Sequence, residues 1–102
     1  DGLVKLACEL SRLCREKRVT FIVNDDPFIA KESNADGVHL GQEDALKYSV
    51  AETRDIIGKG KIIGVSTHSL AQLTRADKED VDYIAYGPIF PTKTKETALL
   101  KK

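Results

Sequence analysis

The sequence lacks several features that mark specialised classes of protein. It has no methionine, no tryptophan, only 2 cysteines among 102 residues, and no apolar run long enough to cross a bilayer. Sixteen basic and sixteen acidic residues cancel, and no long block of like charge stands out. This balance argues against nucleic acid or an anionic membrane as the main partner. We expect one small domain with one core.

The cysteines and the start of the chain bear on the cellular compartment. Cys8 and Cys14 are six residues apart in one predicted helix, which makes an intrachain disulfide geometrically unfavourable. The first residues also lack the charged and apolar regions of a signal peptide. We therefore expect reduced thiols and a cytoplasmic location.

Strand patterns alternate with helix patterns along the chain. Apolar residues at three- and four-residue spacing predict an amphipathic helix over residues 2–17, and β-branched runs predict the strands. The predicted strands cover residues 19–23, 36–40, 61–65 and 82–86, and the intervening helices run from 27 to about 33, from 49 to 57 and from 69 to about 78. Residues 97–102 show no strand pattern. Regular alternation predicts an α/β fold of parallel strands with right-handed crossovers.

Capping patterns define the ends of three predicted helices. Asp26 precedes a proline and suits an N-cap, and Asn34 can end the same helix in the left-handed conformation. The pairs Ser49–Glu52 and Ser69–Gln72 have the spacing of capping boxes.

Polar clusters follow each predicted strand, and parallel strands bring their C-terminal ends to one edge of the sheet. The clusters are Asn24 and Asp25; Gln42, Glu43 and Asp44; Ser66, Thr67 and His68; and Thr92, Thr94 and Lys95. Carboxylates from neighbouring strands suit Mg²⁺, and threonines with a lysine suit phosphate oxygens. No zinc-ligand spacing, nucleophile elbow or P-loop is present, so metal-bridged pyrophosphate chemistry fits better than acyl transfer.

Each of these residues also has a structural interpretation. Asn24 and Asp25 could form a turn, Asp44 could begin a helix, Ser66 could be an ordinary strand-end hydroxyl, His39 could be a hydrogen-bonded core histidine, and Thr92 and Thr94 could be turn residues. Asp26 is assigned to capping and His68 to a supporting role, and Glu43 receives no role.

Four stretches together resemble thiamine-phosphate synthase. They read FIVND over residues 21–25, ADGVHLGQED over 35–44, GVSTHS over 64–69 and DYIAYGPIFPTKTK over 82–95. The resemblance runs from about residue 10 to residue 96, with the motifs in order and correctly spaced. It implies a (β/α)₈ barrel that uses Mg²⁺ to join a hydroxymethylpyrimidine pyrophosphate to a thiazole phosphate. Pyrophosphate leaves first in that chemistry, and the thiazole nitrogen captures a pyrimidine cation.

The resemblance also implies roles for individual residues. Asp25 and Asp44 match the Mg²⁺ ligands; Asn24, Ser66 and Lys95 match groups that hold pyrophosphate; Thr92 and Thr94 match contacts to the thiazole phosphate; His39 and Gly41 match the lining of the pyrimidine pocket. Preorganised cations and donors lower the barrier to pyrophosphate departure, so no nucleophilic side chain is expected.

The chain departs from the family pattern at both ends. The family's Gln-x-Arg-x-Lys motif belongs to an earlier strand, which we expect upstream of residue 1. Arg15-Glu16-Lys17 resembles the end of this motif but lies on the predicted helix before the first strand. The phosphate loops of the last two strands are expected after residue 96. A full barrel needs about 250 residues. We expect residues 1–102 to be a single incomplete barrel segment of four consecutive parallel βα units, approximately strands three to six, from a longer polypeptide.

Two other functions stay open. One is a thiazole tautomerase-like relative on the same fold, and the other is a non-catalytic half-barrel that binds a phosphate ligand or a partner chain. The Asn24–Asp25 pair with Asp44 favours the synthase, because the relative has no need of metal-bridged pyrophosphate. We expect small-molecule substrates and no nucleic-acid or membrane partner, with homo-oligomerisation left open.

Overall fold

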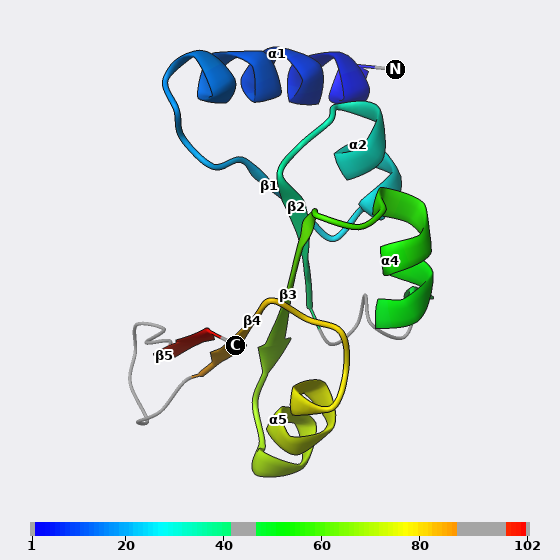
Figure 1. The fold of residues 1–102 in the computed structure, drawn as a ribbon, viewed down its shortest axis with the longest axis vertical. Coiled ribbons are helices and arrows are strands. Elements are labelled where there is room, and N and C mark those ends of the chain that lie inside the picture. Colours follow the sequence, from blue (N-terminus) through cyan, green and yellow to red (C-terminus); the bar gives the residue numbers. More distant parts are fainter. Residues whose placement is uncertain (1, 42–46, 88–97, 102) are drawn as a thin grey trace.

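The computed structural model describes residues 2–41, 47–87 and 98–101, the last range as backbone. Helices and strands alternate through most of the chain (Figure 1). They are α1 (Gly2–Glu16), β1 (Ile22–Asn24), α2 (Pro27–Glu32), β2 (Gly37–Leu40), α4 (Val50–Ile57), β3 (Ile62–Thr67), α5 (Leu70–Asp77), β4 (Tyr83–Tyr86) and β5 (Ala98–Lys101). None of the described helices combines the length and apolarity that a membrane span requires.

The sheet has the order β1-β2-β3-β4-β5, and its first four strands are parallel. The predicted α/β fold with a four-stranded parallel sheet is confirmed. The register places Asn24 beside His39, His39 beside Gly64 and Gly64 beside Tyr83, which forms one row across four strands. Because side chains alternate along a strand, the members of this row share one face of the sheet.

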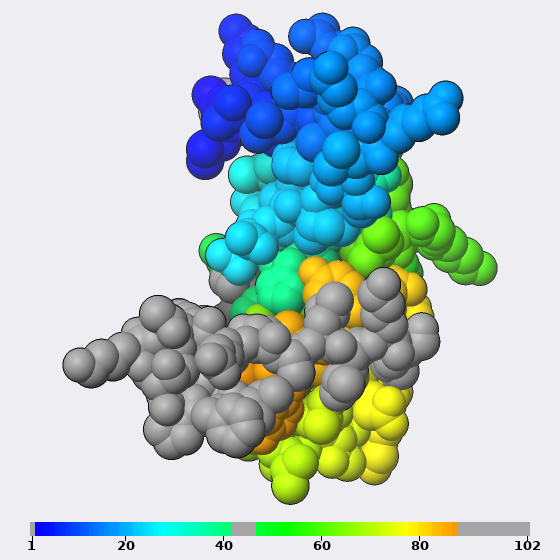
Figure 2. Space-filling view, turned by 90° about the vertical axis from the view of Figure 1, so that its left-hand side faces the viewer, coloured from blue at the N-terminus to red at the C-terminus, as the bar shows by residue number. Residues whose placement is uncertain are grey.

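The opposite face of the sheet carries the hydrophobic core. Val38, Leu40, Ile63, Val65 and Ile84 are buried there. Ala30 of α2, Val50 of α4 and Ala76 of α5 belong to the same cluster, so these helices cover this face. Figure 2 shows the molecule turned by 90° about the vertical axis from the view of Figure 1, with α1 in blue at one end and α5 in yellow-green at the other.

Two predicted strand boundaries are wrong by two residues or more. The first strand begins at Ile22 rather than at residue 19, because Arg18 takes a left-handed conformation with φ 57° after α1 and the following residues connect the helix to the sheet. The third strand continues to Thr67, two residues beyond its predicted end, because β4 pairs with it up to Tyr86. Ser66 therefore lies within a strand rather than in a loop.

The C-terminal segment also differs from expectation. Residues 97–102 were predicted to contain no strand, whereas Ala98–Lys101 forms β5 and pairs antiparallel with β4. An unpaired edge strand exposes a row of backbone donors and acceptors, and β5 supplies partners for that row. Local sequence pattern does not reveal such pairing.

The predicted helix caps are largely confirmed. Asp26 accepts hydrogen bonds from the backbone of α2, and Asn34 has φ 53°. Ser49 and Glu52 form a complete capping box. Ser69 caps α5, but the Gln72 side chain accepts from the backbone N–H of His68 instead of Ser69, so the second box is incomplete.

The first helix contacts little of the sheet. Only Ala7 and Ser11 of α1 are buried, whereas Leu3, Leu6 and Leu13 are exposed on the face that the periodicity predicts to be apolar. Figure 1 shows α1 lying across one end of the molecule, next to α2.

Carboxylates tie the strands together at the N-terminal edge of the sheet. Asp36 accepts from the backbone N–H of Phe21, and Asp82 accepts in the same way from Ile63. Each aspartate also donates its own backbone N–H back to the same neighbour. The same pair of contacts thus occurs twice, and it holds β1 in register with β2 and β3 in register with β4.

Candidate functional site

The described polar clusters lie at the C-terminal edge of the sheet, as predicted. Asn24 and Asp25 end β1, Gly41 follows β2, and Ser66 lies near the end of β3. The parallel pairing of these strands brings their ends to one edge, where α/β proteins bind ligands. The predicted placement of these strand ends at one edge of the sheet is confirmed.

Asp25 and Asp26 have different environments although they are adjacent. Asp26 Oδ1 accepts hydrogen bonds from the backbone N–H of Phe28 at 2.9 Å and of Ile29 at 3.1 Å, which confirms its capping role. Asp25 is exposed, has φ 75°, and donates its backbone N–H to the carbonyl of His39 at 2.8 Å. The left-handed conformation strains a residue with a Cβ, and such strain is concentrated at functional sites.

His39 lies between two hydroxyl groups on the face of the sheet opposite the hydrophobic core. Its Nδ1 is 2.7 Å from Tyr83 Oη, and its Nε2 is 2.6 Å from Ser66 Oγ. The His39 and Tyr83 rings stack, with centroids 5.5 Å apart and planes inclined by 25°. Burial lowers the pKa of His39 and raises the pKa of Tyr83. Both groups are therefore neutral near pH 7.

Two residues of this arrangement were missed by sequence reasoning. Tyr83 supplies the second hydroxyl, and Gly64 makes room for its ring, because a Cβ on Gly64 would lie 1.9 Å from Tyr83 Cζ. A glycine within a β-branched strand often marks a close approach, so the sequence did contain a signal for Gly64. Tyr83 lies in the motif stretch 82–95, but no pattern in the neighbouring sequence indicated its contact with His39.

His68 links the ends of two strands. Its Nδ1 contacts the carbonyl oxygen of Gly87, and the backbone N–H of Gly87 donates to Thr67. These contacts join the end of β3 to the end of β4. The expected supporting role of His68 agrees with this position.

Several predicted site residues lie outside the described residues. They are Asp44, Thr92, Thr94 and Lys95, together with Gln42 and Glu43. Among residues 2–41 and 47–87, no three His, Cys, Asp or Glu side chains are grouped as metal ligands would be. The structure brings His39 and Ser66 into contact beside the end of β1. The predicted metal site of Asp25 and Asp44 stays a prediction.

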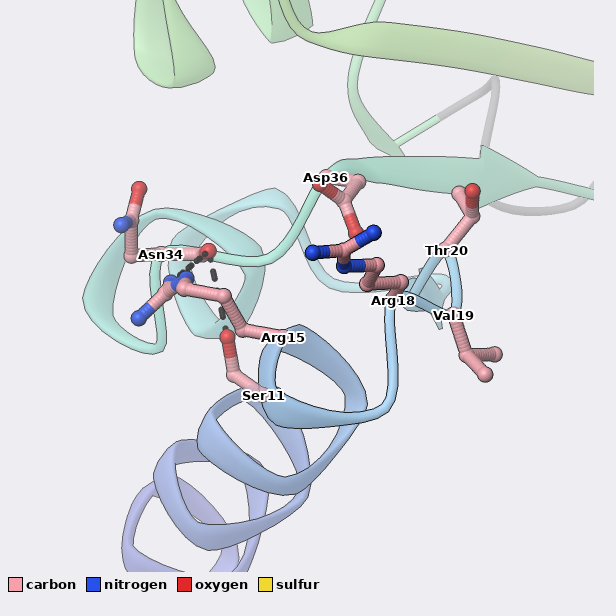
Figure 3. A pocket seen from close by; sticks show the side chains of 7 residues that line it. All are labelled: Ser11, Arg15, Arg18, Val19, Thr20, Asn34 and Asp36. Carbon is pink, nitrogen blue, oxygen red and sulfur yellow. Dashed lines mark hydrogen bonds between the residues drawn. The ribbon is translucent and has the colours of Figure 1, made fainter.

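A polar pocket of about 220 Å³ lies at the opposite, N-terminal edge of the sheet (Figure 3). Arg15, Arg18 and Asp36 contribute to its lining, and Arg15 donates to the carbonyl oxygen of Asn34 at 3.4 Å. Arg15 is thus remote from the C-terminal edge. This position agrees with treating Arg15-Glu16-Lys17 as a false counterpart of the family's substrate-binding motif.

Comparison with known proteins agrees with the resemblance seen in the sequence. The sequence pattern of one family, described as thiamine monophosphate synthase, matches residues 1–101. The chain belongs to the thiamine monophosphate synthase family.

Individual members of the thiamine monophosphate synthase family match over 96 residues each. The chain is 51% identical to a thiamine-phosphate synthase of Synechococcus, 48% to the thiamine biosynthesis bifunctional protein ThiED of Geobacter sulfurreducens, and 47% to a thiamine-phosphate synthase of Lawsonia intracellularis. These matches include 93%, 94% and 94% of this chain, but 26%, 19% and 43% of the three relatives. The chain therefore spans less than half of each relative.

A solved structure shares the fold. The thiamine phosphate pyrophosphorylase from Pyrococcus furiosus superposes with a TM-score of 0.77 at 34% identity. The match covers 89% of this chain and 43% of that protein.

Proposed function

We propose that the polypeptide containing this chain is a transferase that condenses hydroxymethylpyrimidine pyrophosphate with thiazole phosphate, giving thiamine phosphate and pyrophosphate. Family membership supports the reaction class. The observation that carries the assignment is the contact between His39 and Ser66 next to the end of β1, since three motif stretches meet there. The expected substrates are small molecules in the cytoplasm.

In this proposal the sheet is part of a (β/α)₈ barrel. Its four parallel strands carry helices on one face, while the row from Asn24 to Tyr83 lies on the other, as barrel-lining residues do. The exposed leucines of α1 and the partial coverage of the relatives support further packing partners for this segment. Barrel closure would surround His39 with additional strands.

Asp25 suits the proposed Mg²⁺ site. Its carboxylate is exposed at the C-terminal edge, its backbone is strained, and the neighbouring Asp26 uses its own carboxylate to cap α2. A hard oxygen ligand at this edge fits the preference of Mg²⁺, and Asp44 would supply the second carboxylate. The ion would neutralise charge on the pyrophosphate.

The remaining predicted residues would bind and orient the substrates. Asn24, Ser66 and Lys95 would hold pyrophosphate, Thr92 and Thr94 would contact the thiazole phosphate, and His39 and Gly41 would line the pyrimidine pocket. Because pyrophosphate leaves before the new bond forms, donors aimed at its oxygens lower the barrier and no nucleophile is needed. The half-buried, neutral His39 suits contact with an uncharged ring.

The decisive experiment measures thiamine phosphate formation with Mg²⁺ by the whole gene product and by the 102-residue chain. We expect activity in the first and little or none in the second. In the whole product, Asp25→Gly should lower turnover by at least about a hundredfold. It should leave stability unchanged or slightly higher, because glycine relieves the left-handed strain.

The matched control is Asp26→Ala at the adjacent position. Losing this cap should lower the free energy of unfolding by about 1 kcal/mol while turnover changes little. Near-normal turnover in Asp25→Gly would remove the metal assignment. A whole gene product that forms no thiamine phosphate but converts a thiazole tautomer would favour the tautomerase-like alternative. A gene product with neither activity would favour the non-catalytic half-barrel.

A further inference from the structure

Tyr83, His39 and Ser66 form a continuous chain of hydrogen bonds across three neighbouring strands. The two links are 2.7 Å and 2.6 Å long, and both nitrogens of the imidazole take part. Tyr83 comes from β4, His39 from β2 and Ser66 from β3. The imidazole is therefore fixed at both of its polar atoms.

The tyrosine reaches His39 by crossing an intervening strand. The register places Gly64 of β3 between His39 and Tyr83, and the missing side chain leaves space for the phenol ring. Stacking of the phenol on the imidazole further restricts the ring of His39. Any residue larger than glycine at position 64 would displace Tyr83 and break this link.

The chemistry of the three groups gives the chain a direction. A neutral imidazole has one donor and one acceptor nitrogen. A phenol is more acidic than an aliphatic hydroxyl, so it is the better donor. The favoured arrangement has Tyr83 O–H donating to Nδ1 and the Nε2–H of His39 donating to Ser66 Oγ. Ser66 then acts as a donor, through its own proton, toward a third group.

We propose that Tyr83 and His39 are positioning residues that orient the Ser66 hydroxyl as a hydrogen-bond donor to a diphosphate oxygen at the C-terminal edge of the sheet. The inference rests on the proposed function for the identity of the ligand. Phosphate oxygens of a diphosphate anion only accept hydrogen bonds, so a serine held as a donor matches them. A donor oriented in advance needs no reorganisation when charge develops on the leaving group.

The test compares Tyr83→Phe with Tyr86→Phe in the whole gene product. Tyr86 lies on the same strand with its side chain directed to the opposite face, so it controls for loss of a phenol hydroxyl. Tyr83→Phe should lower kcat by about tenfold with little change in KM, and Ser66→Ala should lower it by about a hundredfold. Tyr86→Phe should leave both parameters within about twofold.

A second readout does not require activity. Nitrogen-15 NMR should show His39 in the Nε2–H tautomer, with a mixture of tautomers in Tyr83→Phe and no change in Tyr86→Phe. Calorimetry with inorganic pyrophosphate and Mg²⁺ should show weaker binding by Tyr83→Phe than by the unaltered protein.

These measurements separate two failures. Absence of thiamine phosphate formation by the unaltered gene product would overturn the proposed function. The His39 tautomer and the pyrophosphate affinity would still test whether Tyr83 and His39 orient Ser66. An Nδ1–H tautomer of His39, or equal kcat and equal pyrophosphate affinity in Tyr83→Phe and the unaltered protein, would overturn the proposed orientation of Ser66.

Discussion

The phenol ring of Tyr83 lies directly against the α-carbon of Gly64. A Cβ at position 64 would lie 1.9 Å from Tyr83 Cζ and 2.3 Å from both Cε atoms. No side-chain contact of that length exists in a folded protein, so any substitution must move the ring. The absence of a side chain at Gly64 therefore leaves the space that the ring of Tyr83 occupies.

The first prediction concerns that contact. Gly64→Ala should lower the free energy of unfolding of the whole gene product by about 1–3 kcal/mol, because overpacking forces the ring of Tyr83 away. The double variant Gly64→Ala/Tyr83→Ala should lose less than the sum of the single losses. Chemical denaturation measures the four free energies, and strict additivity would contradict the contact.

The second prediction compares two fully buried threonines. Among the described residues, Thr53 Oγ1 on α4 is buried with no hydrogen-bond partner, whereas Thr67 Oγ1 donates to the carbonyl oxygen of Ala85 at 3.0 Å. Thr53→Val should raise the free energy of unfolding by about 1 kcal/mol, since it removes an unsatisfied hydroxyl. Thr67→Val should lower it by about 1 kcal/mol. Thermal denaturation of both variants provides the comparison, and equal shifts would contradict it.

The third prediction concerns Arg54 of α4, which contacts two acidic residues. Asp82 Oδ2 accepts from Arg54 Nη2 at 3.2 Å and from the backbone N–H of Ile63 at 2.8 Å. Asp80 is more exposed, and within the described part of the chain its carboxylate pairs with Arg54 alone, at 3.0 Å. Asp82→Ala should cost about 1–2 kcal/mol of stability, because a strand N–H loses its acceptor. Asp80→Ala should cost about 0.5 kcal/mol or less. A larger loss in Asp80→Ala would show that the ion pair dominates.

The fourth prediction concerns pH. Burial lowers the pKa of His39 in the folded protein below its ordinary value of 6.5. The unfolded chain then binds more protons between the folded pKa and 6.5, so stability should fall as the pH falls through that window and be fully present above it. Unfolding measured from pH 7.5 to 5 in the absence of substrate should show this slope. The slope should be smaller in His39→Gln, and an unchanged slope would assign the effect to other groups.

Local signals predicted a large share of this molecule. The Asp26 cap, the Ser49–Glu52 capping box and the left-handed Asn34 each depend on residues within four positions of one another. Alternating strand and helix patterns then gave the parallel sheet and the edge at which Asn24 and Asp25 lie. Ser69–Gln72 shows the limit of such patterns, since the neighbouring N–H of His68 competed for the same side chain.

The motif resemblance extended this to the family and to His39 and Ser66 as site residues. It did not show that the two side chains touch, and it gave no role to Tyr83, although Tyr83 lies in the motif stretch 82–95. These residues are 27 and 44 positions from His39 in the sequence, and the strand register alone brings them together. The roles of Asp44, Thr92, Thr94 and Lys95 stay predictions.

The sequence by itself determined the alternation of elements, their caps and the family, because those properties depend on near neighbours and on ordered motifs. Only the tertiary structure decided that His39 is fixed between Tyr83 and Ser66, that Gly64 is needed for that arrangement, and that β5 pairs with β4. Each of these depends on which backbone atoms pair across strands. That pairing is set by the packing of the whole sheet, which depends on residues far apart in the sequence and cannot be inferred from a short stretch.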